Sequence, residues 1–132
     1  MRGTKAGKIL AVKPLYSRLL KKYLNRNPLD FEGFKVYLNP EDSIITEMAV
    51  AGNYEKAEFD LLRKLLKTGD KILDIGANIG LYSVFCALAT GPAGHVFSFE
   101  PEPVNFSFLK KNIDLNKLNN ITASDFAVSS KE

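Results

Sequence analysis

The stretch KILDIGANIGLYS (residues 71–83) decides the fold of this chain. Its first five residues are a short apolar run that predicts a buried β-strand, and the glycines that follow are typical of a tight turn. The next segment, IGLYSVFCALA (residues 79–89), is apolar on nearly every side and predicts a buried helix. A strand, a glycine turn and a buried helix in this order are typical of an α/β protein.

The alternation of strand and helix continues downstream. HVFSFE (residues 95–100) predicts a second strand, PEPVNFSFLKKNIDLNKL (101–118) an amphipathic helix that begins with prolines, and NITASD (120–125) a third strand. Helical crossovers join parallel strands, and right-handed crossovers give the strand order 3-2-1 with helices covering the faces of the sheet. The sequence therefore predicts a Rossmann-like α/β fold.

The residues before this unit predict an extension. Residues 9–24 carry apolar side chains at helical spacing between basic ones, and FEGFKVYLN (31–39) alternates around a glycine as in a short hairpin. Residues 54–66 again have helical spacing, and we expect Gly69 to cap the end of that helix. The sequence therefore predicts a basic helix and hairpin over residues 1–50 and an α/β part over residues 51–132.

Composition limits the function classes. The chain has 132 residues, of which 45% are hydrophobic, enough for one domain with a core. The single cysteine and single histidine predict neither a disulfide nor a metal site, and no stretch is long and apolar enough for a signal peptide or a membrane span. We expect a cytoplasmic protein.

Charge is unevenly distributed. Residues 1–29 carry eight Lys or Arg and no acid, whereas residues 30–132 carry 10 basic and 15 acidic residues. A basic segment of this kind can mark contact with nucleic acid or with an anionic membrane surface, but it is more often a solvated face. We expect no nucleic-acid partner, and the sequence makes no prediction about the oligomeric state.

The glycine turn at residues 76–80 predicts a ligand site. Glycine lets the backbone turn sharply, and the amides that open the next helix would offer donors to an anionic group. The dinucleotide pattern would need glycines where the chain has Asn78 and Leu81, and the P-loop ending Gly-Lys-Ser/Thr is missing. What remains is the pattern D-x-G-x-N-x-G.

Three acids follow three strands at the same edge of the predicted sheet: Asp74, Glu100 and Asp125. Glu100 comes about twenty residues after the glycine turn, where a carboxylate can accept both hydroxyls of a ribose. The three together suit a ligand with an amine, a ribose and an adenine. Simpler explanations stay open: the glycines serve the turn alone, Asn78 caps the helix, and Glu100 complements the dipole of the next helix.

Several segments together resemble the FkbM-type family of class I S-adenosylmethionine-dependent methyltransferases. They are LDIGANIGLYS (73–83), FSFEPEPVNF (97–106), LKKNIDLN (109–116) and DFAVSS (125–130), and GNYEKAEFDLL (52–62) is similar to the entry segment of the family. The resemblance implies S-adenosyl-L-methionine as cofactor. The cofactor-binding positions that it implies are Glu55, Asp74, Gly76, Ala77, Asn78, Gly80, Glu100, Pro101, Asp125 and Phe126.

The resemblance also implies a role for each position. The glycine turn with Asp74 would line the methionine part of the cofactor, and Glu55 would lie near the entry of the pocket. Glu100 would hold the ribose and Pro101 would flank the adenine. Asp125 and the amide of Phe126 would face the adenine edge. The family usually has Asp where this chain has Ser130, so we assign Ser130 no role.

The reaction implied by the resemblance is direct displacement of the sulfonium methyl group by an oxygen of a small molecule, sugar or lipid. The family has about seven strands and this sequence shows three, so it reads as the cofactor half, and we identify no catalytic residue. Two alternatives remain open. One is a non-catalytic nucleoside-binding module or a fragment that needs a partner chain, and the other is an NAD-dependent oxidoreductase.

Overall fold

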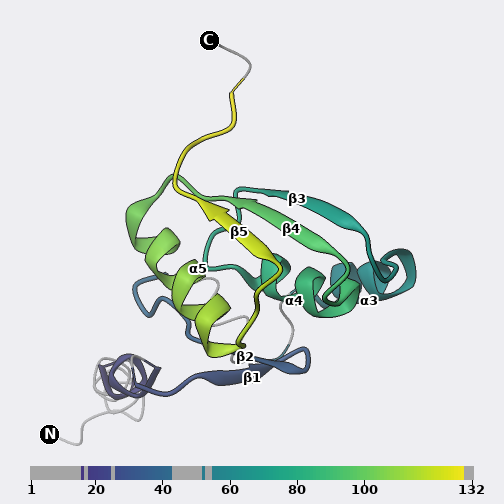
Figure 1. The fold of residues 1–132 in the computed structure, drawn as a ribbon. Helices are drawn as coiled ribbons and strands as arrows, with labels where there is room; N and C mark the ends of the chain where they lie inside the picture. Colours follow the sequence, from purple (N-terminus) through teal and green to yellow (C-terminus); the bar gives the residue numbers. More distant parts are fainter. Residues whose placement is uncertain (1–15, 17, 25, 43–51, 53–54, 130–132) are drawn as a thin grey trace, which may run out of the picture.

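A computed structural model describes residues 16, 18–24, 26–42, 52 and 55–129. The chain forms a three-stranded sheet, and Figure 1 shows helices packed against one of its faces and a short hairpin beyond them. The strands are β3 (Lys71–Ile75), β4 (His95–Phe99) and β5 (Ile121–Ser124), all parallel and in the order β3-β4-β5. The predicted Rossmann-like fold is confirmed, and each strand lies where the sequence placed it.

The two crossover helices are α4 (Leu81–Thr90) and α5 (Pro103–Leu115). Both cover the same face of the sheet (Figure 1), because both crossovers are right-handed and move across the sheet in one direction. The opposite face carries exposed apolar side chains: Leu73 is 68% and Ile75 is 62% exposed. Helices on both faces, as expected from the sequence, are therefore not found in the described part of the chain.

Helix α4 is buried because it lies between the sheet and the hairpin. Its residues Val84, Phe85 and Cys86 are buried in the same core as Val96 of β4. Phe59, from the preceding helix α3 (Lys56–Leu65), packs edge-on against Phe85 with ring centroids 5.0 Å apart. This explains why the sequence of α4 is apolar on nearly every side.

The glycine expected to cap α3 has a different role. Helix α3 ends at Leu65, and the next residue, Leu66, is extended. Gly69 has φ of 90°, and its amide donates a hydrogen bond of 2.9 Å to the carbonyl of Thr90 at the end of α4. Gly69 therefore ties the loop before β3 to α4.

The predicted hairpin is present as β1 (Leu29–Phe31) and β2 (Phe34–Val36). Its two turn residues, Glu32 and Gly33, have φ of 48° and 93°, the combination of a two-residue type I′ turn. Phe31, Phe34 and Val36 belong to the same hydrophobic core as the sheet and helices. The hairpin thus forms one wall of the core.

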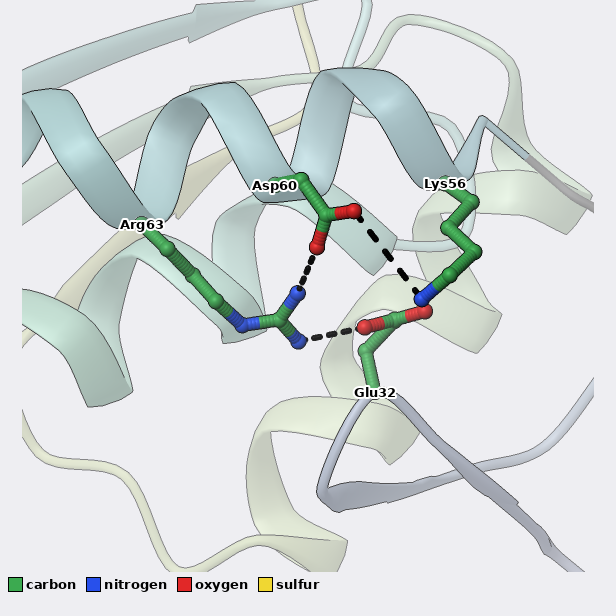
Figure 2. A network of polar contacts seen from close by, with 4 residues as sticks. All are labelled: Glu32, Lys56, Asp60 and Arg63. Carbon is green, nitrogen blue, oxygen red and sulfur yellow. Dashed lines mark hydrogen bonds and ion pairs between the residues drawn. The ribbon is translucent and has the colours of Figure 1, made fainter.

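An ion-pair network holds the hairpin turn against α3 (Figure 2). The guanidinium of Arg63 contacts the carboxylate of Glu32 and, at 2.9 Å, that of Asp60. Lys56 lies 4.0 Å from Asp60 on the same helix. Glu32 has a positive φ, a conformation that few non-glycine residues adopt, and this side-chain contact favours it.

Two asparagines of α5 bond to the outer edge of the hairpin. Asn112 accepts from the amide of Tyr37 at 2.7 Å and donates to its carbonyl at 3.0 Å. One helical turn later, Asn116 accepts from the amide of Lys35 at 3.1 Å and donates to its carbonyl at 2.7 Å. The two side-chain amides replace a neighbouring strand, so the outward-facing backbone groups of Lys35 and Tyr37 are paired.

The predicted N-terminal helix is confirmed at residues 16 and 18–24, and the remainder of the predicted range lies outside the described residues. Leu24 is 1% exposed, and Lys21 forms an ion pair of 2.8 Å with Glu41. Among the described helices, none has the length and apolar character needed to cross a membrane.

Candidate cofactor site

The glycine turn after β3 is bonded to the end of β4. The amides of Gly76 and Ala77 both donate to the carbonyl of Phe99, at 2.9 and 3.0 Å. The next amide, that of Asn78, donates to the carboxylate of Glu100 at 2.7 Å. Three successive backbone donors are thus used to hold the turn against the neighbouring strand.

The amides expected to be available to an anionic group are those that open the next helix, and the amides of the turn before it are not among them. The amides of Gly76, Ala77 and Asn78 are instead paired with β4 and Glu100, and that of Gly80 donates to the carbonyl of Ala77 at 2.8 Å. Because these four amides are already hydrogen-bonded, a ligand at the turn would contact mainly its side chains and carbonyls.

The two glycines of the turn are required for different reasons. Both have positive φ, 79° at Gly76 and 89° at Gly80. A Cβ on Gly80 would lie 2.5 Å from Cδ1 of Leu109 on α5, whereas a Cβ on Gly76 would meet nothing within 4 Å. Gly80 therefore allows the turn to pack against α5, and Gly76 borders open space.

Asn78 does not cap the helix. The N-cap of α4 is Gly80, and no side chain bonds there. Asn78 has φ of 51°, which Asn tolerates better than most residues, and its side-chain oxygen Oδ1 is buried without a hydrogen-bond partner among the described residues. A buried acceptor without a partner costs about 1–3 kcal/mol, so a donor from a ligand would stabilise it.

The buried carboxylate of Glu100 holds the glycine turn by hydrogen bonds. Its side chain is 6% exposed, and its two oxygens accept from the amides of Asn78 at 2.7 Å and Glu102 at 2.9 Å. The N-cap of α5 is Glu102, whose carboxylate accepts from the amide of Asn105 at 2.7 Å. Glu100 instead links the glycine turn to the start of α5.

Asp74 lies beneath the turn, on the helix-covered side of the sheet. Its carboxylate accepts from the hydroxyl of Ser83 at 2.5 Å, and that hydroxyl lies 2.7 Å from the hydroxyl of Ser98 on β4. Both serines are fully buried. Burial raises the pKa of Asp74 above its usual value and the nearby Glu100 raises it further, while the Ser83 hydrogen bond acts in the opposite direction.

A cavity of about 230 Å³ opens beside the turn, and its wall includes a residue that the sequence did not indicate. Glu55 and Tyr82 lie on it together with the residues of the turn. The hydroxyl of Tyr82 donates to the carboxylate of Glu55, and its ring stacks on Phe59 with centroids 4.8 Å apart. In the sequence, Tyr82 is part of the segment 79–89 that predicts a buried helix. Its place in the first turn of the helix after the glycines is the only signal that could have indicated the site.

Six of the expected residues are not on the wall of this cavity: Asp74, Gly80, Glu100, Pro101, Asp125 and Phe126. Pro101, Asp125 and Phe126 are all exposed and follow the carboxyl ends of β4 and β5. The ring of Phe126 is 58% exposed and lies 5.5 Å from that of Phe99. The structure thus brings Glu55 and residues 76–78 together at the cavity, with Glu100 bonded to the amide of Asn78 and the last three residues exposed at the carboxyl ends of β4 and β5.

A Rossmann-like sheet with a glycine turn after its first strand and an acid after its second is the arrangement of proteins that bind a nucleoside-containing cofactor, class I methyltransferases among them. The sequence profile of the TRM5/TYW2 methyltransferase domain matches residues 47–129. The chain therefore belongs to this family of S-adenosylmethionine-dependent methyltransferases. The expected enzyme class and cofactor are confirmed at this level of family.

Two curated proteins illustrate the relationship. A tRNA (guanine(37)-N(1))-methyltransferase of Drosophila pseudoobscura pseudoobscura is 33% identical over 102 residues, which are 76% of this chain and 20% of that protein. The 31-O-demethyl-FK506 methyltransferase FkbM of Streptomyces tacrolimicus is 45% identical over 47 residues, which are 36% of this chain and 18% of that protein. The chain thus spans about a fifth of the length of these relatives.

Solved structures share the fold. TYW2 of P. horikoshii in complex with MeSAdo superposes with a TM-score of 0.60 at 24% identity, covering 76% of this chain and 35% of that one. TYW2 of M. jannaschii in complex with AdoMet gives 0.59 at 22% identity, covering 74% and 42%. The complex of aTrm5 with tRNALeu gives 0.57 at 22% identity, covering 74% and 27%.

The comparisons bear on two expectations, that the chain has no nucleic-acid partner and that it resembles the FkbM-type family. The expectation of no nucleic-acid partner is wrong for this family, because its members include the tRNA methyltransferase relative and the aTrm5 that was solved with tRNALeu. The FkbM-type resemblance is matched over 47 residues only, whereas the TRM5/TYW2 profile spans residues 47–129.

Proposed function

We propose that this chain binds S-adenosyl-L-methionine at the glycine turn, and that it serves methyl transfer to a tRNA. One observation carries the cofactor proposal: the buried Oδ1 of Asn78 has no partner among the described residues, and Asn78 lies on a cavity that Glu55 also lines. An unpaired acceptor and a carboxylate on one cavity suit the ammonium group of the methionine part.

The other residues fit the rest of the cofactor. Each oxygen of Glu100 accepts one backbone hydrogen bond, and a carboxylate oxygen can accept a second. Glu100 can therefore bind a ribose hydroxyl and keep its bonds to the amides of Asn78 and Glu102. Pro101 and the exposed ring of Phe126 offer apolar surface to an adenine, with Asp125 beside them. Residues 51–132 form the cofactor-binding part in this proposal, and residues 1–50 an extension.

When bound, the cofactor supplies an already activated methyl group. The contribution of this chain is then to hold the cofactor in one orientation and to exclude water, which Tyr82 does by bonding to Glu55 beside the turn. A tRNA acceptor is supported by the 33% identity with the tRNA (guanine(37)-N(1))-methyltransferase over 102 residues.

Calorimetric titration with S-adenosylhomocysteine tests the cofactor proposal. Wild type should bind it, and Asn78→Leu should weaken binding about tenfold or more, because a lost charge-assisted hydrogen bond contributes about 1.5–3 kcal/mol. Asn119→Leu is the matched control, since Asn119 is exposed and lies after α5. Binding of NAD in preference to S-adenosylhomocysteine would overturn the proposal.

A second acceptor class has its own support. The 45% identity with the FkbM methyltransferase over 47 residues favours O-methylation of a small molecule. Transfer of a radioactive methyl group distinguishes the two, with tRNA and a small-molecule extract offered in separate reactions. Label in the tRNA supports the first class, and label only in the small-molecule fraction supports the second. Cofactor binding without any transfer would indicate a non-catalytic nucleoside-binding module.

A further inference from the structure

The N-terminal helix presents a face that the cofactor site does not use. Tyr16, Leu19 and Tyr23 are spaced by three and four residues, so they form one stripe along the helix, and they are 61%, 58% and 55% exposed. We name the surface formed by this stripe and the cations beside it the basic-aromatic face.

Cations lie beside this stripe. Arg18 and Lys22 are one helical turn apart, Arg26 lies in the turn that follows the helix, and all three are exposed. In the described part of the chain none of them forms an ion pair, whereas Lys21, on the inner side, is bonded to Glu41. The positive charge of these three side chains is therefore available to a partner.

The partner that this face fits is an RNA. We infer that the basic-aromatic face binds the phosphates of an RNA with Arg18, Lys22 and Arg26, while Tyr16 and Tyr23 stack on unpaired bases. Cations that follow a backbone, interleaved with aromatic rings, are the usual means of binding single-stranded nucleic acid. The inference rests on the proposed function for the identity of the nucleic acid, because it assigns a docking surface to the same substrate class.

The orientation of the helix argues against a lipid surface. A helix that lies in a membrane interface turns its strongest apolar face outward, into the lipid. Here Leu24 is 1% exposed and faces the protein. Among the described residues 16 and 18–24, the outward side has one exposed aliphatic residue, Leu19, between two tyrosines and beside the cations, which suits phosphate and base contacts better than acyl chains.

The experiment measures binding of the full chain to a fluorescein-labelled RNA stem-loop by fluorescence anisotropy over a series of salt concentrations. The charge variant is Arg18→Glu/Lys22→Glu/Arg26→Glu, and the aromatic variant is Tyr16→Ala/Tyr23→Ala. The matched control reverses three exposed lysines on and after α3, at positions 64, 67 and 71, and so has the same net charge as the charge variant.

The charge variant should bind RNA at least tenfold more weakly than the control, and its slope of log K against log salt should fall by about 2, because each phosphate contact on a single strand contributes roughly 0.7. The aromatic variant should lose about tenfold with an unchanged slope. Equal RNA affinity of the charge variant and the control would overturn the inference. So would binding to vesicles containing phosphatidylserine that depends on these residues while RNA binding does not.

Calorimetry with S-adenosylhomocysteine separates this inference from the proposed function. The charge variant should keep wild-type affinity for S-adenosylhomocysteine, because its residues lie outside the cofactor cavity. If wild type binds RNA through this face but binds no S-adenosylhomocysteine, the cofactor proposal fails and the docking surface stands. If wild type binds S-adenosylhomocysteine and the charge variant keeps full RNA affinity, the docking surface fails alone.

Discussion

Gly76 and Gly80 allow a comparison in which backbone conformation is matched and packing is not. Both have φ between 79° and 89°, so replacement by alanine carries the same left-handed penalty, about 1–2 kcal/mol. Only at Gly80 would the new Cβ lie 2.5 Å from Cδ1 of the fully buried Leu109. Overpacking a buried site of this kind adds about 1–3 kcal/mol. Gly80→Ala should therefore lower the free energy of unfolding by about 2–5 kcal/mol and Gly76→Ala by about 1–2 kcal/mol.

Urea denaturation followed by circular dichroism measures both values. The assignment of the excess to Leu109 can be checked with Gly80→Ala/Leu109→Val, in which the clashing side chain is shortened. The loss in the double variant should be smaller than the sum of the two single losses, because residues in contact do not contribute independently. Equal destabilisation by the two glycine variants, or strict additivity in the double variant, would refute the packing argument.

Other predictions concern single groups. Asp74→Asn should change how stability depends on pH. Because burial raises the pKa of Asp74 in the folded protein, its stabilising contribution is present below the unfolded-state pKa of about 4 and is lost as pH rises through the folded-state pKa. In urea titrations at increasing pH, the free energy of unfolding of wild type should therefore fall relative to that of the variant. Burial raises the pKa of Cys86 to about 11, so its thiol should resist Ellman's reagent at about pH 8 until urea unfolds the protein, and rapid labelling of the native chain would contradict this burial. Asn112→Ala should lower the free energy of unfolding by about 3–5 kcal/mol in urea titrations, because it leaves backbone groups at Tyr37 and Ile79 without their partner, whereas a loss under 1 kcal/mol would show that water replaces it. Tyr82→Phe should change stability by about 1 kcal/mol at most, since the stack on Phe59 is kept, yet weaken binding of S-adenosylhomocysteine in calorimetry.

The elements of the sheet could be predicted because their signals are local. Residues 71–75 and 95–99 are short apolar runs bounded by turn residues, and the helix at 81–90 is apolar on nearly every side because seven of its ten residues are buried. The hairpin turn at Glu32 and Gly33 was likewise indicated by one glycine between alternating residues. A local sequence pattern is sufficient to predict an element whose residues carry the signal within the element itself.

The site was less predictable because its contacts join distant segments. That the amides of Gly76 and Ala77 are taken by Phe99 depends on the register of β3 against β4, which no local pattern contains. The contact of Tyr82 with Glu55 similarly depends on how α3 packs against α4. Gly69 was expected to cap α3 because glycine readily adopts the left-handed conformation of a helix cap. It does adopt that conformation, but in the loop before β3, three residues after the C-cap Leu66.

The asparagine pairing between α5 and the hairpin has a consequence for synthesis. The backbone groups of Lys35 and Tyr37 are bonded to side chains that lie 81 and 75 residues later in the chain. At elongation rates of about 5–20 residues per second, the edge of the hairpin waits roughly 4–16 s for those side chains to be made. The hairpin is translated before α5, so the backbone groups at its edge are among the last to find their hydrogen-bond partners. In that interval the open strand edge is exposed to chaperones and to neighbouring nascent chains.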